Sequence, residues 1–168
     1  MSEADLPPWK PELDAIVGAR HGGQVAGVLK RLQDLDARYP NVGEIAYQIA
    51  WTLDVLGQKQ DALPWYEKAV ALGLSPNELS GALIGLGSTL RCLGRYDRAA
   101  EVLESGQRQF PDQREFDVFL AMTRHNQDRH AEAMELLLTL LADTSEDVGV
   151  TAYQRAIRYY ADKLDAAP

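Results

Sequence analysis

The sequence is poor in cysteine, and its single thiol, Cys92, cannot form a disulfide within the chain. One cysteine is also too few for a cysteine-based metal cluster, so neither kind of cross-link is expected to hold the fold together. A chain of 168 residues does not need one, because a domain of this size removes about 70% of its unfolded surface from water. We therefore expect a reducing compartment, with the cytoplasm as the default location.

Long hydrophobic runs are also missing. No apolar stretch approaches the roughly 20 residues that cross a bilayer. The first ten residues, MSEADLPPWK, carry acids and prolines where a secretion signal would have basic residues followed by an apolar run. We expect neither a secretion signal nor a membrane partner.

Basic residues are outnumbered: 17 Lys and Arg stand against 25 Asp and Glu, which gives a formal net charge of −8. An acidic surface repels phosphate backbones unless its few cations cluster strongly. The composition therefore excludes nucleic acid as the main partner.

Alternation of apolar and polar residues with a period of two is almost absent, whereas apolar residues at spacings of three and four recur from Leu13 to Leu164. Glycines, prolines and Asp-rich turns interrupt this pattern at short intervals. The sequence predicts an all-α chain of about nine helices. Pro64 falls inside one of them, and since an interior proline removes a helical hydrogen bond, that helix is expected to start close by, near residues 59–61.

Turn residues recur at a regular interval. Gly57 lies 34 residues after Gly23, and Gly94 lies 37 residues after Gly57. Asp128 follows after a further 34 residues. Each interval holds two candidate helices, so the chain repeats a helix-turn-helix unit.

Residues at matching positions of these units support the repeat. They are the small residues Ala62, Ala99 and Ala133, the large residues Tyr66, Leu103 and Leu137, the aromatic-proline exits Tyr39-Pro40 and Phe110-Pro111, and the pairs Ile49-Ala50, Leu86-Gly87 and Leu120-Ala121. With this period, the chain resembles the tetratricopeptide repeat (TPR) family. The stretch LGSTLRCLGRYDRAAEVLESG at Leu86–Gly106 resembles small uncharacterised bacterial members.

The resemblance implies a right-handed superhelical stack of antiparallel helix pairs, an α-solenoid in which each pair covers its neighbour's apolar face. It also implies a homodimer, since such members are thought to self-associate, and it implies no reaction. We expect a flexible tail at 1–8, a degenerate first repeat at 9–42, three repeats at 43–145 and a capping helix at 146–168. The stripe Val150, Tyr153, Ile157, Tyr160 and Leu164 is expected to cover the open end of the stack.

No motif supports catalysis or a cofactor. The glycines of GALIGLG at Gly81–Gly87 lack the spacing of a dinucleotide fingerprint and fit tight helix packing better. His125 and His130 have no third ligand at a spacing usual for zinc. Cys92 lies beside a cation but has no evident partner base, so a buried or half-buried structural thiol is expected. The sequence predicts a protein that is not an enzyme and needs neither metal nor cofactor.

The first helix of each pair lines the concave side in this class of repeat, which predicts a binding surface for a peptide or protein segment. Its candidate contact residues are Tyr47, Trp51, Ser88, Arg91, Met122 and His125. Alternatively, Tyr47 and Trp51 simply pack against the first repeat. Some family members clamp a peptide's C-terminal carboxylate with Lys and Asn at these positions, and Tyr47 and Trp51 there argue against that mode.

The C-terminal helix offers a second candidate surface. Tyr159 lies off the expected packing stripe, with Arg155 and Arg158 nearby, and tyrosine and arginine are enriched at interfaces. The alternative function is therefore a structural homodimer that uses Tyr159 and Arg155 and has no peptide ligand. The sequence identifies no particular partner.

Overall fold

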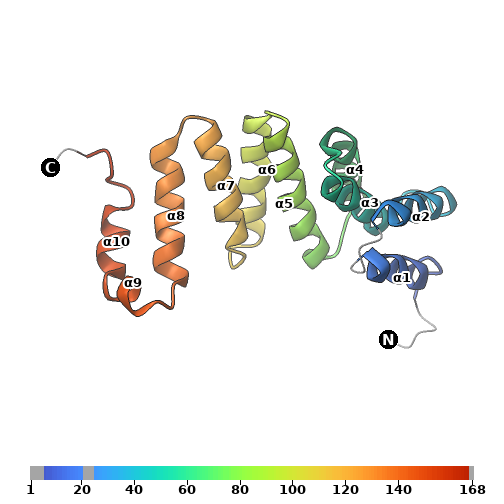
Figure 1. The fold of residues 1–168 in the computed structure, drawn as a ribbon, viewed down its shortest axis with the longest axis horizontal. Helices are drawn as coiled ribbons and strands as arrows, with labels where there is room; N and C mark the ends of the chain where they lie inside the picture. Colours follow the sequence, from blue (N-terminus) through green and yellow to red (C-terminus); the bar gives the residue numbers. More distant parts are fainter. Residues whose placement is uncertain (1–5, 21–24, 167–168) are drawn as a thin grey trace. The chain divides into compact units, whose positions relative to one another are not determined.

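A computed structural model describes residues 6–20 and 25–166, and in this part of the chain it contains ten α-helices and no strand (Figure 1). The helices are α1 (Lys10–Arg20), α2 (Val25–Arg38), α3 (Gly43–Val55), α4 (Lys59–Leu72), α5 (Pro76–Cys92), α6 (Tyr96–Gln109), α7 (Glu115–Asn126), α8 (His130–Thr144), α9 (Val148–Ala152) and α10 (Gln154–Tyr160). The predicted all-α fold is confirmed, and α4 begins at Lys59 as the position of Pro64 required. The predicted turn at Gly23 lies outside the described residues.

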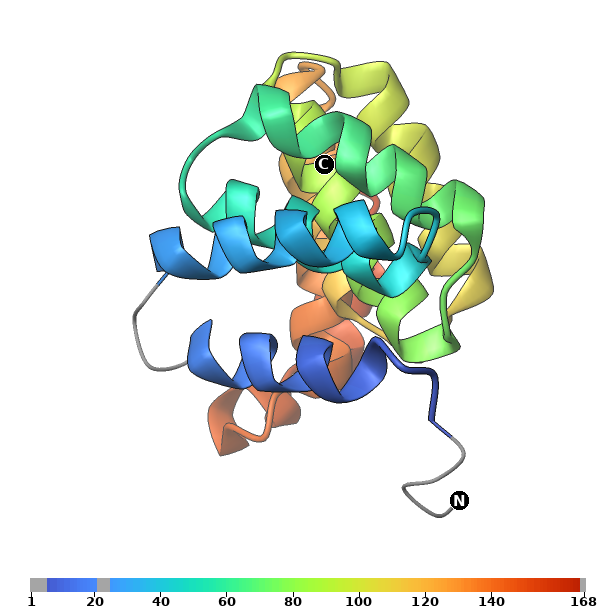
Figure 2. The ribbon, with the colours of Figure 1, turned by 90° about the vertical axis from the view of Figure 1, so that its right-hand side faces the viewer.

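The helices divide into two compact units, unit 1 (residues 1–89) and unit 2 (residues 90–168), and the division falls within α5. In unit 1, α1 packs on α2, α2 on α3, and α3 on α4; Figure 2 shows α1 and α2 lying side by side. In unit 2, α6 packs on α7, α7 on α8, and α8 on α10. Contact between successive helices is the packing that a helical repeat predicts.

The turns inside the helix pairs share one backbone geometry. Gly57, Gly94 and Asp128 all have a positive φ, at 75°, 74° and 59°. In each turn the next residue donates its N–H to the carbonyl five residues earlier at 2.9 Å, from residue 58 to 53, 95 to 90 and 129 to 124. Such a left-handed residue closes a helix and satisfies its terminal carbonyls. The three positions that the sequence pattern aligned are therefore structurally equivalent.

Small residues let the helices approach closely in both units. A Cβ placed on Gly85 would lie 2.5 Å from the phenol oxygen of Tyr66, which is 1% exposed. A Cβ on Gly106 would lie 2.6 Å from Cζ of the fully buried Phe116, and closer still to Cε1. These glycines take the places where an aromatic ring of a neighbouring helix fills the space, because packed interiors leave no voids of that size.

The C-terminal segment differs from the expected single capping helix. It forms α9 and α10, two short helices that meet at Tyr153. The Asp147 side chain caps α9 by accepting a 3.0 Å hydrogen bond from the N–H of Val150. Much of the expected packing stripe is exposed, with Tyr153 at 69%, Tyr160 at 59% and Leu164 at 49%. The stripe fails to pack as predicted because the break at Tyr153 prevents one continuous helical face.

Candidate functional site

A pocket of about 480 Å³ lies in unit 2, between α7 and α8 and beside the last turn of α5. Its lining consists of Arg91, Ala121, Met122, His125, Asn126, His130, Ala133, Met134 and Leu137. The volume falls within the range typical of small-ligand pockets, so it is large enough for one or two side chains of a partner.

The pocket is mainly apolar because of how the α7–α8 pair is built. Ala121 and Ala133 are buried, and their small side chains leave space between the two helices. Met134 and Leu137 of α8 also line the pocket, yet they are 43% and 39% exposed. Leu141, 44% exposed, continues the same side of α8 at the next turn. Flexible thioether and branched aliphatic side chains of this kind adapt to varied apolar partners.

Polar groups at one end of the pocket come from three helices. Arg91 of α5 donates from Nη1 to Oδ1 of Asn126 at 3.0 Å, while its Nε atom is buried without a hydrogen-bond partner among the described residues. The Nδ1 atoms of His125 and His130 lie 3.1 Å apart, so one ring donates a hydrogen bond and the other accepts it. None of the lining residues is an acid.

The structure brings Arg91, Met122 and His125 of the predicted surface together in this pocket. Ser88 belongs to unit 1 and is half-buried. Sequence reasoning missed Asn126, His130, Met134 and Leu137 as lining residues. A signal was present for the last two, since Met134, Leu137 and Leu141 recur at spacings of three and four and share one side of α8.

Tyr47 and Trp51, the other predicted contacts, belong to a separate cluster in unit 1. The Arg20 guanidinium of α1 lies 3.4 Å from the centroid of the Trp51 ring, and its Nη1 donates to Oγ1 of Thr52 at 3.3 Å. The rings of Tyr47 and Tyr66 lie 6.3 Å apart. Trp51 thus contacts α1 of the first repeat, as the alternative interpretation described, whereas Tyr47 contacts Tyr66 of α4, outside that repeat.

Burial shifts the ionisation of this cluster. It lowers the pKa of Arg20 to about 10, because the largely buried guanidinium loses hydration, although the nearby phenols of Tyr47 and Tyr66 act in the opposite sense. Burial likewise raises the pKa of Tyr47 and of Tyr66. For Tyr66 the neighbouring Asp54 carboxylate adds to the effect, and it accepts a 3.5 Å hydrogen bond from the phenol.

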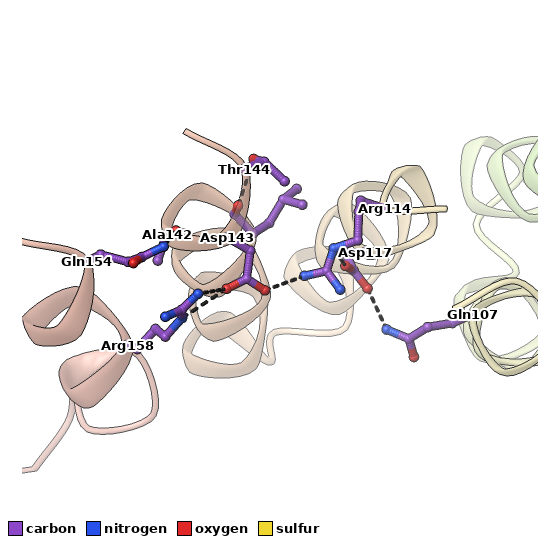
Figure 3. A network of polar contacts seen from close by, with 9 residues as sticks. Gln107, Arg114, Asp117, Ala142, Asp143, Thr144, Gln154 and Arg158 are labelled. Atoms are coloured by element: carbon purple, nitrogen blue, oxygen red, sulfur yellow. Dashed lines mark hydrogen bonds and ion pairs between the residues drawn. The ribbon is translucent and has the colours of Figure 1, made fainter. Parts of the chain in front are cut away.

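A polar network attaches the C-terminal helices to the rest of unit 2 (Figure 3). The Asp143 carboxylate accepts from Nη2 of Arg114 at 2.9 Å and from Nε and Nη2 of Arg158 at 2.9 and 2.7 Å. Arg114 also pairs with Asp117 at 3.2 Å, and Asp117 accepts from Gln107 at 2.6 Å. Ion pairs and hydrogen bonds therefore join α6, α7, α8 and α10.

The second predicted surface lies on α10, where Tyr159 is 61% exposed and its ring lies 5.0 Å from that of Tyr160. Arg155 is exposed as well, whereas Arg158 is engaged with Asp143. The Lys163 ammonium lies 4.6 Å from the Tyr159 ring centroid.

The remaining candidate features do not form a functional site. Cys92 is exposed, so the expectation of a buried or half-buried thiol is wrong; it is the last residue of α5, where the helix ends. Among the residues that the structure describes, no group of three or more His, Cys, Asp or Glu side chains is placed to hold a metal ion. No helix in the described ranges has the length and apolar character needed to cross a membrane.

Repeated helix pairs with equivalent turns, small residues at the contacts and an apolar pocket define a helical-repeat protein of the class that serves as interaction modules. A family model for the tetratricopeptide repeat matches residues 43–164, and the chain belongs to this family. The predicted family is thus confirmed.

Several solved structures share the fold. A MamA double mutant (RS-1 ArsTM) matches with a TM-score of 0.67 and 18% identity over 96% of this chain and 99% of that one. A MamA structure from Desulfovibrio magneticus RS-1, which runs from residue 41 to the end, matches with a TM-score of 0.72 and 20% identity. The match covers 94% of this chain and 89% of that one. The Cut9–Hcn1 hetero-tetramer of the APC/C matches with a TM-score of 0.74 and 16% identity, over 89% of this chain and 29% of that one. No curated protein matches the sequence.

Proposed function

We propose that this chain is a non-enzymatic interaction module that binds a peptide or protein segment on the side formed by the first helices of its repeats. The central contact is the α7–α8 pocket of unit 2, with Arg91, Met122 and His125. The observation that carries the proposal is that Met134 and Leu137, both more than a third exposed, line a pocket of about 480 Å³. Exposed apolar groups that gather in a concave site mark interaction surfaces.

The methionines allow a direct test. The chain has three, and two of them, Met122 and Met134, line the pocket. Short random peptides are displayed and selected on the immobilised protein, and the selected peptides are titrated into protein with ¹³C-labelled methionine methyl groups. We expect the Met122 and Met134 signals to shift together during titration.

A pair of variants controls for side effects on folding. Met134→Glu puts a charge into the pocket and should weaken binding of the selected peptides at least tenfold, since an apolar contact would then face a desolvated carboxylate. Val148→Glu places the same charge at a residue of unit 2 that is 84% exposed and does not line the pocket. It should leave binding unchanged. Equal effects of the two variants, or peptides that leave both methyl signals unmoved, would reject the pocket as the binding site.

Self-association through the C-terminal segment is a second candidate, and the exposure of Tyr153, Tyr159 and Tyr160 favours it. Exposed tyrosines are typical of interfaces. Light scattering over a range of concentrations measures the mass directly. A dimer that Tyr159→Glu or Arg155→Glu converts to monomer would support this function, and a monomer at all concentrations would exclude it.

A further inference from the structure

We infer that the α7–α8 pocket selects a segment in which an Asp or Glu side chain stands next to large apolar residues. This inference rests on the proposed function and names the chemistry of the partner. The apolar side chains of the segment would contact Met122, Met134 and Leu137, while the carboxylate would face Arg91.

The charge of Arg91 is the first support. Four other arginines of unit 2 are paired with carboxylates: Arg114 with Asp117 and Asp143, Arg124 with Glu104, Arg129 with Glu132, and Arg158 with Asp143. Arg91 instead donates to the neutral amide of Asn126, and no acid lines the pocket around it. In a protein with a formal net charge of −8, this end of the pocket carries an uncompensated cation. A guanidinium in such a place binds carboxylates well, because its donors are fixed and weakly hydrated.

Asn126 holds that guanidinium in position. The 3.0 Å hydrogen bond to its Oδ1 uses one donor at Nη1, and the Nε atom is buried. A partner therefore meets the outer part of a guanidinium whose orientation is already fixed, which reduces the entropy lost on binding.

The backbone at the start of α8 adds to the positive potential. His130 is the first residue of α8, and His130 and Ala133 both line the pocket, so the N-terminal end of this 15-residue helix lies beside it. The partial positive charge of a helix N-terminus favours a nearby carboxylate. The Nδ1 atoms of His125 and His130 bond to each other, and Nε2 of His130 lies 3.8 Å from the exposed carboxylate of Asp128, so the two imidazoles are already engaged.

A side-chain carboxylate fits this arrangement better than the end of a chain. The apolar surface continues along α8 from Met134 through Leu137 to Leu141, which spans about 10 Å at 1.5 Å per residue. A bound segment could lie along this apolar surface and reach Arg91 with a carboxylate side chain. It would then use both the surface and the guanidinium while its backbone continues past the pocket. The helix-in-groove and extended-peptide modes both allow this.

The experiment compares peptides selected on the wild-type protein from two libraries, one with the random segment inside a longer chain and one with it at a free C-terminus. We expect enrichment from the internal library, with Asp or Glu next to large apolar residues. Replacing that acid by its amide in a selected peptide should weaken binding about tenfold or more, as expected for loss of a charged hydrogen bond. The wild-type protein suffices for this comparison, so it does not depend on the folding of any variant.

Protein variants then locate the effect. Arg91→Gln should weaken binding of the acidic peptide by a similar factor and binding of its amide analogue much less. Arg91→Lys should retain part of the preference for the acid. Peptides that shift the Met122 and Met134 signals without any preference for an acid, or that bind only through a free C-terminus, would overturn this inference and leave the proposed function standing. Absence of any binding at the pocket would instead reject the proposed function.

Discussion

Gly106 offers a direct test of how closely the helices of unit 2 pack. It is a buried residue of α6, and the ring of Phe116 from α7 occupies the space that a Cβ would take. In Gly106→Ala the new methyl group would lie 2.6 Å from Cζ, whereas carbon atoms pack at about 3.5–4.0 Å. The ring or the helix must therefore move by about 1 Å. Phe116 is fully buried and stacked on Phe110 at 6.2 Å, so it has little room to do so.

The expected loss of stability follows from two opposing terms. Overpacking a tight core costs about 1–3 kcal/mol, and the absence of free space around Phe116 favours the upper end. Alanine in place of glycine inside a helix contributes about 1 kcal/mol in the opposite direction. We expect Gly106→Ala to lower the free energy of unfolding by about 2 kcal/mol.

Gly18→Ala is the matched control, because Gly18 also lies inside a helix but a Cβ there would meet nothing within 4 Å. It should raise the free energy of unfolding by about 0.5–1 kcal/mol. Urea unfolding followed by circular dichroism at 222 nm measures both variants. All three tryptophans precede residue 90, so their fluorescence reports on unit 1 and separates its unfolding from that of unit 2. The packing argument would be refuted if the free energy of unfolding of Gly106→Ala were equal to or higher than that of Gly18→Ala.

Three further predictions concern ionised groups. Because burial raises the pKa of Tyr66, ionisation of its phenol above pH 10 favours the unfolded chain. This group should therefore lower the free energy of unfolding of the wild-type protein by up to about 1.4 kcal/mol per pH unit as the pH rises. Urea unfolding of Tyr66→Phe at the same pH values should show a shallower fall. Arg20→Met removes a buried cation but keeps an unbranched side chain against Trp51. Unfolding followed by tryptophan fluorescence should therefore show a free energy of unfolding about 1 kcal/mol higher than in the wild type. A free energy lower by that amount would show that the cation–π contact dominates. Asp143→Asn weakens the ion pairs with Arg114 and Arg158, which are partly exposed. The free energy of unfolding should therefore change by less than about 1 kcal/mol. Amide hydrogen exchange should become faster in α9 and α10 and stay the same in α4.

The sequence predicted much of the repeat because its signals are local. Gly57, Gly94 and Asp128 mark one turn geometry at a regular spacing, and each residue adopts the same left-handed conformation for the same backbone reason. The aligned alanines Ala62, Ala99 and Ala133 are all buried at helix contacts. Period and small-residue spacing therefore sufficed for the fold.

The candidate site was harder to predict, because it depends on which side chains meet. Arg91, Met122 and His125 share a helical face by spacing, but Asn126, His130, Met134 and Leu137 join them only through the packing of α8 on α7. The C-terminal stripe had the spacing of a capping helix, yet the break at Tyr153 left it exposed. Helical spacing predicts a face, and it does not predict whether another element covers that face.

By itself, then, the sequence determined the helices, their turns and the order in which they pack, since propensity, periodicity and turn chemistry act between residues close together in the chain. The tertiary structure alone decided that Trp51 stacks with Arg20 in unit 1, and that Arg91 lines an apolar pocket and donates to the neutral amide of Asn126. These features depend on distances between residues more than 30 positions apart, which no local pattern encodes.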